Sequence, residues 1–104
     1  MTTDERPRAA LRRLLAAPEV LVMPGVYDAL SASLVQRNGF HGAYMSGGGV
    51  SMSLIGFPDL GFTTMTEMAG QVGRIAAVLD IPVVADADTG YGNALSVQRT
   101  VAEY

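Results

Sequence analysis

Several residue types are absent or scarce in this chain of 104 residues, and each absence narrows its function. There is no cysteine, which excludes a disulfide framework and any metal site built on thiolates. Lysine is absent too, so the 7 basic residues are all arginine, against 10 acidic residues and a net charge of −3. A chain with this balance lacks the basic patch that binds nucleic acid. We therefore expect no nucleic-acid partner.

Long apolar runs are also absent. No stretch approaches the roughly 20 apolar residues needed to cross a bilayer, and residues 1–10 are polar, without the apolar segment of a secretory signal. Hydrophobic residues still make up 49% of the chain, which is enough for a folded core. We expect one domain over residues 1–104 with a flexible terminus at 1–7, no membrane contact and a cytoplasmic location.

Hydrophobic periodicity predicts helices and strands that alternate along the chain. Helices are expected over about 7–17, 27–39, 65–79 and 94–104, and short apolar strands over 20–25, 42–47 and 82–88. Pro24-Gly25 is expected to end the first strand. Thr64 and Glu67 stand at capping-box spacing before the third helix. Residues 47–63 are predicted to form a long glycine-containing loop with a helical turn near 51–55.

This alternation predicts a parallel sheet with right-handed crossovers. The strands are apolar throughout rather than alternating, so we expect both faces of the sheet to be covered. In such α/β folds ligands bind at the carboxyl ends of the strands. Each of the three expected strand ends carries more glycine or polar residues than a turn needs, at 24–25, 46–49 and 86–88.

Asp86 and Asp88 are the first candidate functional residues. Side chains two positions apart in an extended segment point the same way, so both carboxylates are expected to face one spot. Two anions there repel unless a cation, a proton or strong donors compensate, and Mg²⁺ prefers oxygen ligands. The spacing alone leaves a structural alternative open, in which Asp88 caps the next turn and Asp86 pairs with an arginine.

The segment SGGGV at 46–50 follows the second strand and is the next candidate. Its glycines expose backbone N–H groups with little obstruction, so it can hold a carboxylate or phosphate, and the Ser46 hydroxyl adds a donor. A flexible linker is the alternative, but the position after a strand favours anion binding. Asp59 lies in the long loop, where functional lids occur, although an exposed turn explains it equally. Tyr44 lies near the same strand ends and is assigned to substrate binding, with packing as the alternative.

Four segments together resemble the isocitrate lyase and phosphoenolpyruvate mutase superfamily. They are MPGVYDALSA, YMSGGGVS, GFPDLG and VVADADTGYGN, in the same order and with similar spacing as in that superfamily. The resemblance runs from about residue 21 to residue 104. SGGGV is more similar to the 2-methylisocitrate lyase branch, which includes carboxyvinyl-carboxyphosphonate phosphorylmutase-like proteins, than to the other mutases. The resemblance implies the N-terminal portion of a (β/α)₈ TIM-type barrel, with three parallel strands and intervening helices.

The resemblance also implies roles for individual residues. Asp86 and Asp88 would be metal ligands for Mg²⁺, with Mn²⁺ as a second metal that fits. Asp59 would be the catalytic loop aspartate near the reacting centre. The segment implied to bind the substrate carboxylate comprises Ser46, Gly47 and Gly48.

The expected function is a Mg²⁺-dependent carbon–carbon lyase acting on a small 2-methylisocitrate-like hydroxy-polycarboxylate, with a pyruvate-like 2-oxo acid product stabilised as its enolate. An oxaloacetate-type decarboxylase and a phosphoenolpyruvate or carboxyphosphonoenolpyruvate mutase share this half of the site. The full-length protein is expected to form a homo-oligomer.

A hypothesis of another class stays open. A barrel of this type takes roughly 250 residues, and these three strands lack the later acidic residues of the metal shell, the lyase loop with its cysteine and the arginine that grips the substrate. The chain would then be a truncated fragment or an assembly partner without catalysis of its own.

Overall fold

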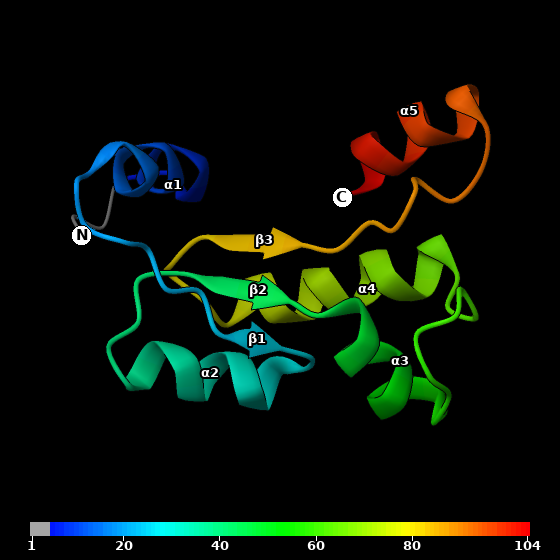
Figure 1. Ribbon diagram of the computed structural model, residues 1–104, viewed down its shortest axis with the longest axis horizontal. Helices are drawn as coiled ribbons and strands as arrows, with labels where there is room; N and C mark the ends of the chain where they lie inside the picture. Colours follow the sequence, from blue (N-terminus) through cyan, green and yellow to red (C-terminus); the bar gives the residue numbers. More distant parts are fainter. Residues whose placement is uncertain (1–4) are drawn as a thin grey trace.

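The computed structural model describes residues 5–104 and contains a parallel sheet with helices around it (Figure 1). The strands are β1 (Gly25–Val26), β2 (Ala43–Met45) and β3 (Val83–Ala85), paired in the order β1-β2-β3. The helices are α1 (Pro7–Ala16), α2 (Ala29–Arg37), α3 (Gly47–Ile55), α4 (Met65–Ala77) and α5 (Ala94–Glu103). The predicted parallel α/β arrangement is confirmed.

The predicted flexible terminus at 1–7 falls largely outside the described residues, which begin at Glu5. The Glu5 carboxylate accepts two hydrogen bonds of 3.1 Å from the Arg13 guanidinium, and Pro7 begins α1. Proline suits this first helical position because the helix needs no N–H there.

Local side-chain chemistry sets the helix starts that the sequence predicts. The Thr64 hydroxyl accepts the Glu67 N–H at the start of α4, and the Glu67 carboxylate accepts the Thr64 N–H, so the predicted capping box is confirmed. Asp28 forms a second capping box with Ser31 at the start of α2, and the Asn93 side chain caps α5 by accepting the N–H groups of Leu95 and Ser96. These caps fix where the chain enters each helix beside the sheet.

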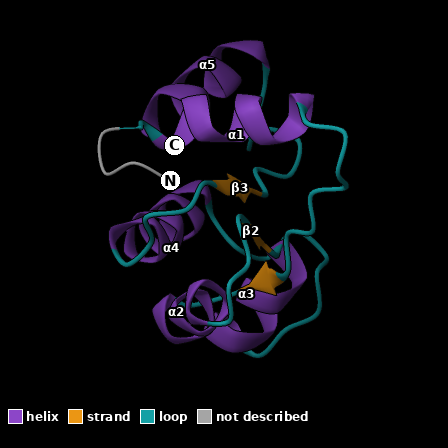
Figure 2. Ribbon diagram, turned by 90° about the vertical axis from the view of Figure 1, so that its left-hand side faces the viewer, coloured by secondary structure: helices purple, strands orange, loops and turns teal. Residues whose placement is uncertain are grey.

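Within residues 5–104, helices cover one face of the sheet and leave the other face open. Helices α2 and α4 lie on one face, as Figure 2 shows, while α1 and α5 lie beyond the β3 edge. Val26 and Met45 are fully buried, whereas the row Gly25, Tyr44 and Val84, which the strand register aligns, is exposed. The expectation that both faces are covered is wrong for the described residues, because neither α1 nor α5 lies over this row.

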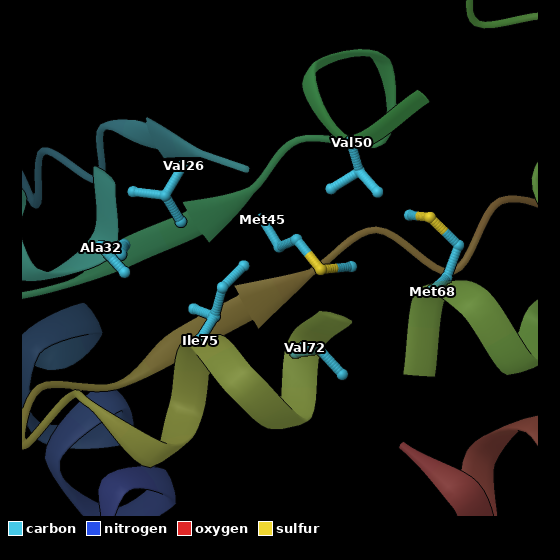
Figure 3. Packing of buried hydrophobic residues seen from close by; sticks show 8 residues of the cluster. Val26, Ala32, Met45, Val50, Met68, Val72 and Ile75 are labelled. Carbon is cyan, nitrogen blue, oxygen red and sulfur yellow. The ribbon is translucent and has the colours of Figure 1, made fainter. Parts of the chain in front are cut away.

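The hydrophobic core lies between the sheet and α2, α3 and α4, as Figure 3 shows. The buried cluster comprises Val26, Ala32, Ala43, Met45, Val50, Met68, Val72 and Ile75. Burying such side chains contributes roughly 25 cal/mol per Å² of apolar surface. The core therefore anchors the amino-terminal part of α3 and the carboxyl ends of β1 and β2 against one another.

Two predicted element bounds are wrong. The run at 20–25 is not paired before Pro24, whose carbonyl accepts the Tyr44 N–H at 3.0 Å. The strand begins at Gly25, so Pro24-Gly25 opens the strand and does not end it. Proline has no N–H to give to a ladder, but its carbonyl can accept from one.

The second correction concerns residues 47–50, predicted as loop. Together with residues 51–55, where a helical turn is predicted, they form helix α3. Each glycine in a helix costs roughly 1 kcal/mol relative to alanine, so three of them in sequence favour a loop assignment. Burial of Val50 and Ser51 and the cap by Ser46 outweigh that cost. The glycines therefore form the first turn of a helix that starts directly after β2.

Among residues 5–104, none of the helices has the length and apolar character that crossing a membrane requires.

Candidate metal and carboxylate site

Asp86 directly follows β3 and its carboxylate has a fixed place. Its N–H donates to the Met45 carbonyl at 3.2 Å, which extends the ladder by one bond. Its Oδ1 accepts the Asp88 N–H at 2.7 Å, and its Oδ2 accepts the Tyr44 hydroxyl at 3.3 Å. Both carboxylate oxygens are thus held at the carboxyl end of the sheet.

The first turn of α3 lies against this carboxylate. A Cβ built on Gly47 would stand 2.6 Å from Asp86 Oδ2, so only glycine lets the two segments approach this closely. The Ser46 hydroxyl accepts the Gly49 N–H at 2.9 Å, while no side chain among residues 5–104 accepts from the N–H of Gly47 or Gly48. The N–H groups of a first helical turn have no intrahelical partner, which makes this end of α3 suited to an anion.

Asp59 approaches the same turn from the other side. Its Oδ2 lies 3.7 Å from the position that a Cβ on Gly48 would take. The buried Ser51 hydroxyl donates to the carbonyls of Phe57 and Pro58 at 2.7 and 3.2 Å, which ties the Asp59 loop to α3. The geometry therefore brings Asp59 to Gly48 and Asp86 to Gly47, on one helix end.

Asp88 is exposed and adopts a left-handed backbone conformation with φ of +48°. It joins the site through its backbone N–H to Asp86. Neither structural alternative holds among residues 5–104: the two ion pairs there join Arg13 to Glu5 and Arg99 to Glu103. The side chain that caps the turn is that of Asp86, not of Asp88.

The acidic residues fit a hard cation only in part. Asp86 and Asp88 supply carboxylate oxygens, the ligand type that Mg²⁺ takes, and Mg²⁺ commonly uses one or two carboxylates and keeps several waters. Within residues 5–104, no group of three or more His, Cys, Asp or Glu side chains gathers at one point. Residues 5–104 therefore bring fewer than three such side chains to any one point, and the other ligand positions are left to water, substrate or further residues.

Burial and the neighbouring Asp86 carboxylate raise the pKa of Tyr44, and Asp59 adds a smaller contribution of the same sign. Each cause disfavours the tyrosinate, because the anion would be poorly solvated and close to other anions. Tyr44 therefore keeps its proton at neutral pH and remains a hydrogen-bond donor at the site.

Two tyrosines that carry no predicted role contact the same segment. The Tyr104 hydroxyl, at the end of α5, donates to the Asp86 carbonyl at 3.0 Å, and the Tyr91 hydroxyl lies 3.3 Å from that of Tyr104. Helical spacing would have placed Thr100 and Tyr104 on one face of α5, but nothing in the sequence indicates that this face meets the residue after β3.

Comparison with known proteins identifies the class of this fold and site. The family described as phosphoenolpyruvate phosphomutase matches residues 11–104, so the chain belongs to that family. A protein named probable 2-methylisocitrate lyase 2, from Corynebacterium glutamicum, is 50% identical over 96 residues, which cover 92% of this chain and 31% of that protein. The predicted superfamily membership is thereby confirmed.

Solved structures agree. 2,3-Dimethylmalate lyase, a member of the PEP mutase/isocitrate lyase superfamily, matches with a TM-score of 0.85 at 43% identity, over 91% of this chain and 34% of that one. Phosphonopyruvate hydrolase in complex with oxalate and Mg²⁺ matches with a TM-score of 0.87 at 32% identity, over 99% of this chain and 35% of that one. The predicted barrel-type fold class is confirmed, and the chain spans about a third of the length of these relatives.

Proposed function

We propose that this chain contributes the first metal ligands and the carboxylate-binding helix end of a Mg²⁺-dependent enzyme that breaks or forms a bond next to a carboxylate in a small acid. The observation that carries the proposal is the contact between the Asp86 carboxylate and the first turn of α3 at Gly47. A cation held by Asp86 and Asp88 would lie beside the N–H groups that hold the substrate carboxylate. The Mg²⁺ and oxalate named for the phosphonopyruvate hydrolase complex support the same pair of ligands.

Each residue then has a part in binding or positioning. The N–H groups of Gly47 and Gly48 would hold the substrate carboxylate, and Tyr44 would hold Asp86 Oδ2 by its protonated hydroxyl. When bound, Mg²⁺ would supply the positive charge that stabilises an enolate product. Asp59 lies beside Gly48, and this position supports its proposed part at the reacting centre, where it would contact the bound substrate.

Within this class, the substrate that we propose is a 2-methylisocitrate-like hydroxy-polycarboxylate, cleaved by a lyase reaction. The similarity to a protein named as a 2-methylisocitrate lyase supports this choice. Decarboxylation of an oxaloacetate-like acid and phosphoryl transfer of the mutase type are the alternatives, since the family description names a phosphomutase. A homo-oligomeric state, a cytoplasmic location and use of Mn²⁺ in place of Mg²⁺ belong to the same proposal.

The test is an assay of the purified protein with 2-methylisocitrate, oxaloacetate and phosphoenolpyruvate, each with Mg²⁺ and with a chelator. The 104-residue chain and any natural extension of it are assayed separately. We expect chelator-sensitive cleavage of 2-methylisocitrate by the extended form. Turnover of one of the other acids instead would select that alternative, and no turnover of any acid would contradict the proposal of an enzyme.

The open row across the sheet favours a second candidate, in which the 104 residues alone have no catalysis. Tyr44 and Val84 are each 37% exposed on this row, and a closed barrel would cover it. The 104-residue chain by itself is then expected to self-associate and to show no turnover, which size-exclusion chromatography beside the same assay would detect. A monodisperse, active monomer would contradict this second candidate.

A further inference from the structure

The backbone of Asp86 is held on both sides of its Cα by different parts of the fold. The N–H before the Cα donates to the carbonyl of Met45 in β2 at 3.2 Å, and the carbonyl after it accepts the Tyr104 hydroxyl at the end of α5 at 3.0 Å. Asp86 is therefore the point where strand β2 and the end of α5 meet. A change in φ or ψ of Asp86 would move its carboxylate relative to Tyr44 and Gly47.

A second bond fixes α5 over the turn that follows Asp86. The buried Thr100 hydroxyl donates to the Gly90 carbonyl at 2.7 Å. Gly90 has φ of +93°, and a Cβ there would stand 2.4 Å from a methyl group of Val97, so the turn packs directly on α5. These contacts pack α5 against the segment 86–92, and this packing places Tyr104 beside Asp86.

The two tyrosine hydroxyls form a directed chain. A tyrosine has one hydroxyl hydrogen, and that of Tyr104 is used on the Asp86 carbonyl. The Tyr91 hydroxyl must therefore donate to the Tyr104 oxygen, at 3.3 Å. Tyr91 does so from a left-handed backbone conformation with φ of +60°, which a residue with a side chain adopts at a cost of order 1 kcal/mol.

A phenol has an ordinary pKa of about 10, so both hydroxyls carry their hydrogens at neutral pH. The direction from Tyr91 through Tyr104 to the Asp86 carbonyl therefore follows from the contacts themselves.

We propose that Tyr104, supported by Tyr91, is a positioning residue that sets the orientation of the Asp86 carboxylate and of the Asp88 segment for the metal. The inference rests on the proposed Mg²⁺ site. A packing role alone needs the two rings but not their hydroxyl groups, so removal of the Tyr104 hydroxyl separates the two roles. Loss of a group that orients a metal ligand typically costs 10–100-fold in metal affinity.

The test compares Tyr104→Phe with Gln36→Met in the purified protein. Gln36 Oε1 accepts the N–H groups of Asp80 and Ile81 at 2.6 and 3.2 Å, so its variant loses hydrogen bonds at the other end of β3. Mg²⁺ affinity is measured by calorimetry. Backbone hydrogen exchange over residues 86–92 is measured without metal, and the melting temperature is recorded for each variant.

For Tyr104→Phe we expect about a tenfold weaker affinity for Mg²⁺ and faster exchange over residues 86–92. Turnover should recover at saturating Mg²⁺, because the chemistry itself is untouched. Gln36→Met should lower the melting temperature without either change. If Tyr104→Phe does not fold, Tyr91→Phe, which removes only the donor to Tyr104, should give the same pattern with a smaller shift.

Unchanged Mg²⁺ affinity and unchanged exchange in Tyr104→Phe would overturn the inference, as would equal changes in Gln36→Met. Failure of the unaltered protein to bind Mg²⁺ would instead overturn the proposed function. In that case the metal-free exchange measurement still decides whether Tyr104 orders the segment.

Discussion

At each end of β3, a side chain accepts backbone N–H groups, but the two side chains differ in charge. At the amino end, the neutral Gln36 side chain accepts two backbone N–H groups with its amide oxygen. At the carboxyl end, Asp86 accepts a backbone N–H and a tyrosine hydroxyl with a charged carboxylate that no arginine among residues 5–104 neutralises. A carboxylate offers one oxygen to each of these two donors, whereas an amide has a single acceptor oxygen. The negative charge that comes with the second oxygen is the part that these hydrogen bonds leave uncompensated.

Strained backbone conformations are also found at the carboxyl end of β3 and not at its amino end. The non-glycine residues with positive φ among residues 5–104 are Asp88 and Tyr91, both just after β3. Such conformations cost of order 1 kcal/mol each and persist where the surroundings enforce them, often at functional sites. The comparison shows that a neutral amide caps the amino end, whereas the carboxyl end combines a carboxylate without an arginine partner among residues 5–104 with two residues in a left-handed conformation.

Exchange of Asp88 for asparagine should have the largest effect. Asp88→Asn removes a proposed metal ligand without changing its size, and we expect kcat/KM to fall by at least about 100-fold, more than the loss of a group that merely orients a ligand. Steady-state kinetics in Mg²⁺ provide the measurement. Asp80→Asn, at the exposed amino end of β3, is the matched control and should stay near the unaltered value. Equal losses in both variants would break the comparison.

A methyl group at Gly47 should have the next largest effect. In Gly47→Ala the new Cβ would stand 2.6 Å from Asp86 Oδ2, which forces the carboxylate to move. Overpacking of this kind costs about 1–3 kcal/mol, which outweighs the helix propensity gained by replacing glycine. Urea unfolding and Mg²⁺ titration should show losses of stability and of affinity.

Gly48→Ala is the control for that experiment. Its Cβ would meet the Asp59 Cβ at an ordinary 3.6 Å, so a methyl group fits there among the described residues. We expect stability near that of the unaltered protein. A larger loss of stability in Gly48→Ala than in Gly47→Ala would show that the contact with Asp86 is not what requires glycine.

At the amino end, Gln36→Met should lower stability and leave activity unchanged. The exposed N–H of Asp80 and the half-buried N–H of Ile81 lose their acceptor, and we expect a loss of about 0.5–1.5 kcal/mol. The measurements are the midpoint of urea unfolding and kcat/KM. A fall in kcat/KM at saturating Mg²⁺ would mean that the two ends of β3 are not independent.

Alkaline pH should give the smallest effect. Burial raises the pKa of Tyr91 and Tyr104, so above about pH 10 the unfolded chain loses these protons while the folded chain retains them. The folded state then binds more protons, and stability falls as pH rises. Urea unfolding at neutral and alkaline pH should show this slope, and Tyr91→Phe should make it shallower. An equal dependence of stability on pH in both proteins would contradict the half-buried hydrogen bonds from Tyr91 to Tyr104 and from Tyr104 to Asp86.

The sequence predicts those features that local chemistry controls. The capping box at Thr64 and the cap at Asn93 could be read from residue types, as could the alternation that predicts a parallel sheet. The candidate residues Asp86, Asp88 and Gly47 could also be selected from the sequence, because they stand at the ends of apolar strands, although the spacing alone leaves structural alternatives open. Their roles remain a prediction, although the geometry brings Asp86 and Gly47 into contact.

Other features depend on distant contacts that no local pattern contains. Glycine propensity argues against α3, and only the burial of Val50 and Ser51 and the cap by Ser46 explain the helix. The sequence predicts that Pro24-Gly25 ends a strand. In the structure this pair opens β1, because the Pro24 carbonyl accepts the Tyr44 N–H. The bond from Tyr104 to Asp86 joins residues 18 positions apart, and spacing on α5 does not indicate it.

Calorimetric titration with Mg²⁺ tests the central claim most directly, because it asks whether the charged end of β3 holds a cation, independently of any substrate. The titration compares the unaltered protein with Asp86→Asn, Asp88→Asn and Asp80→Asn. We predict saturable binding to the unaltered protein and to Asp80→Asn, and loss of that binding in the other two variants. The same affinity in all four proteins, or none in the unaltered one, would contradict the account.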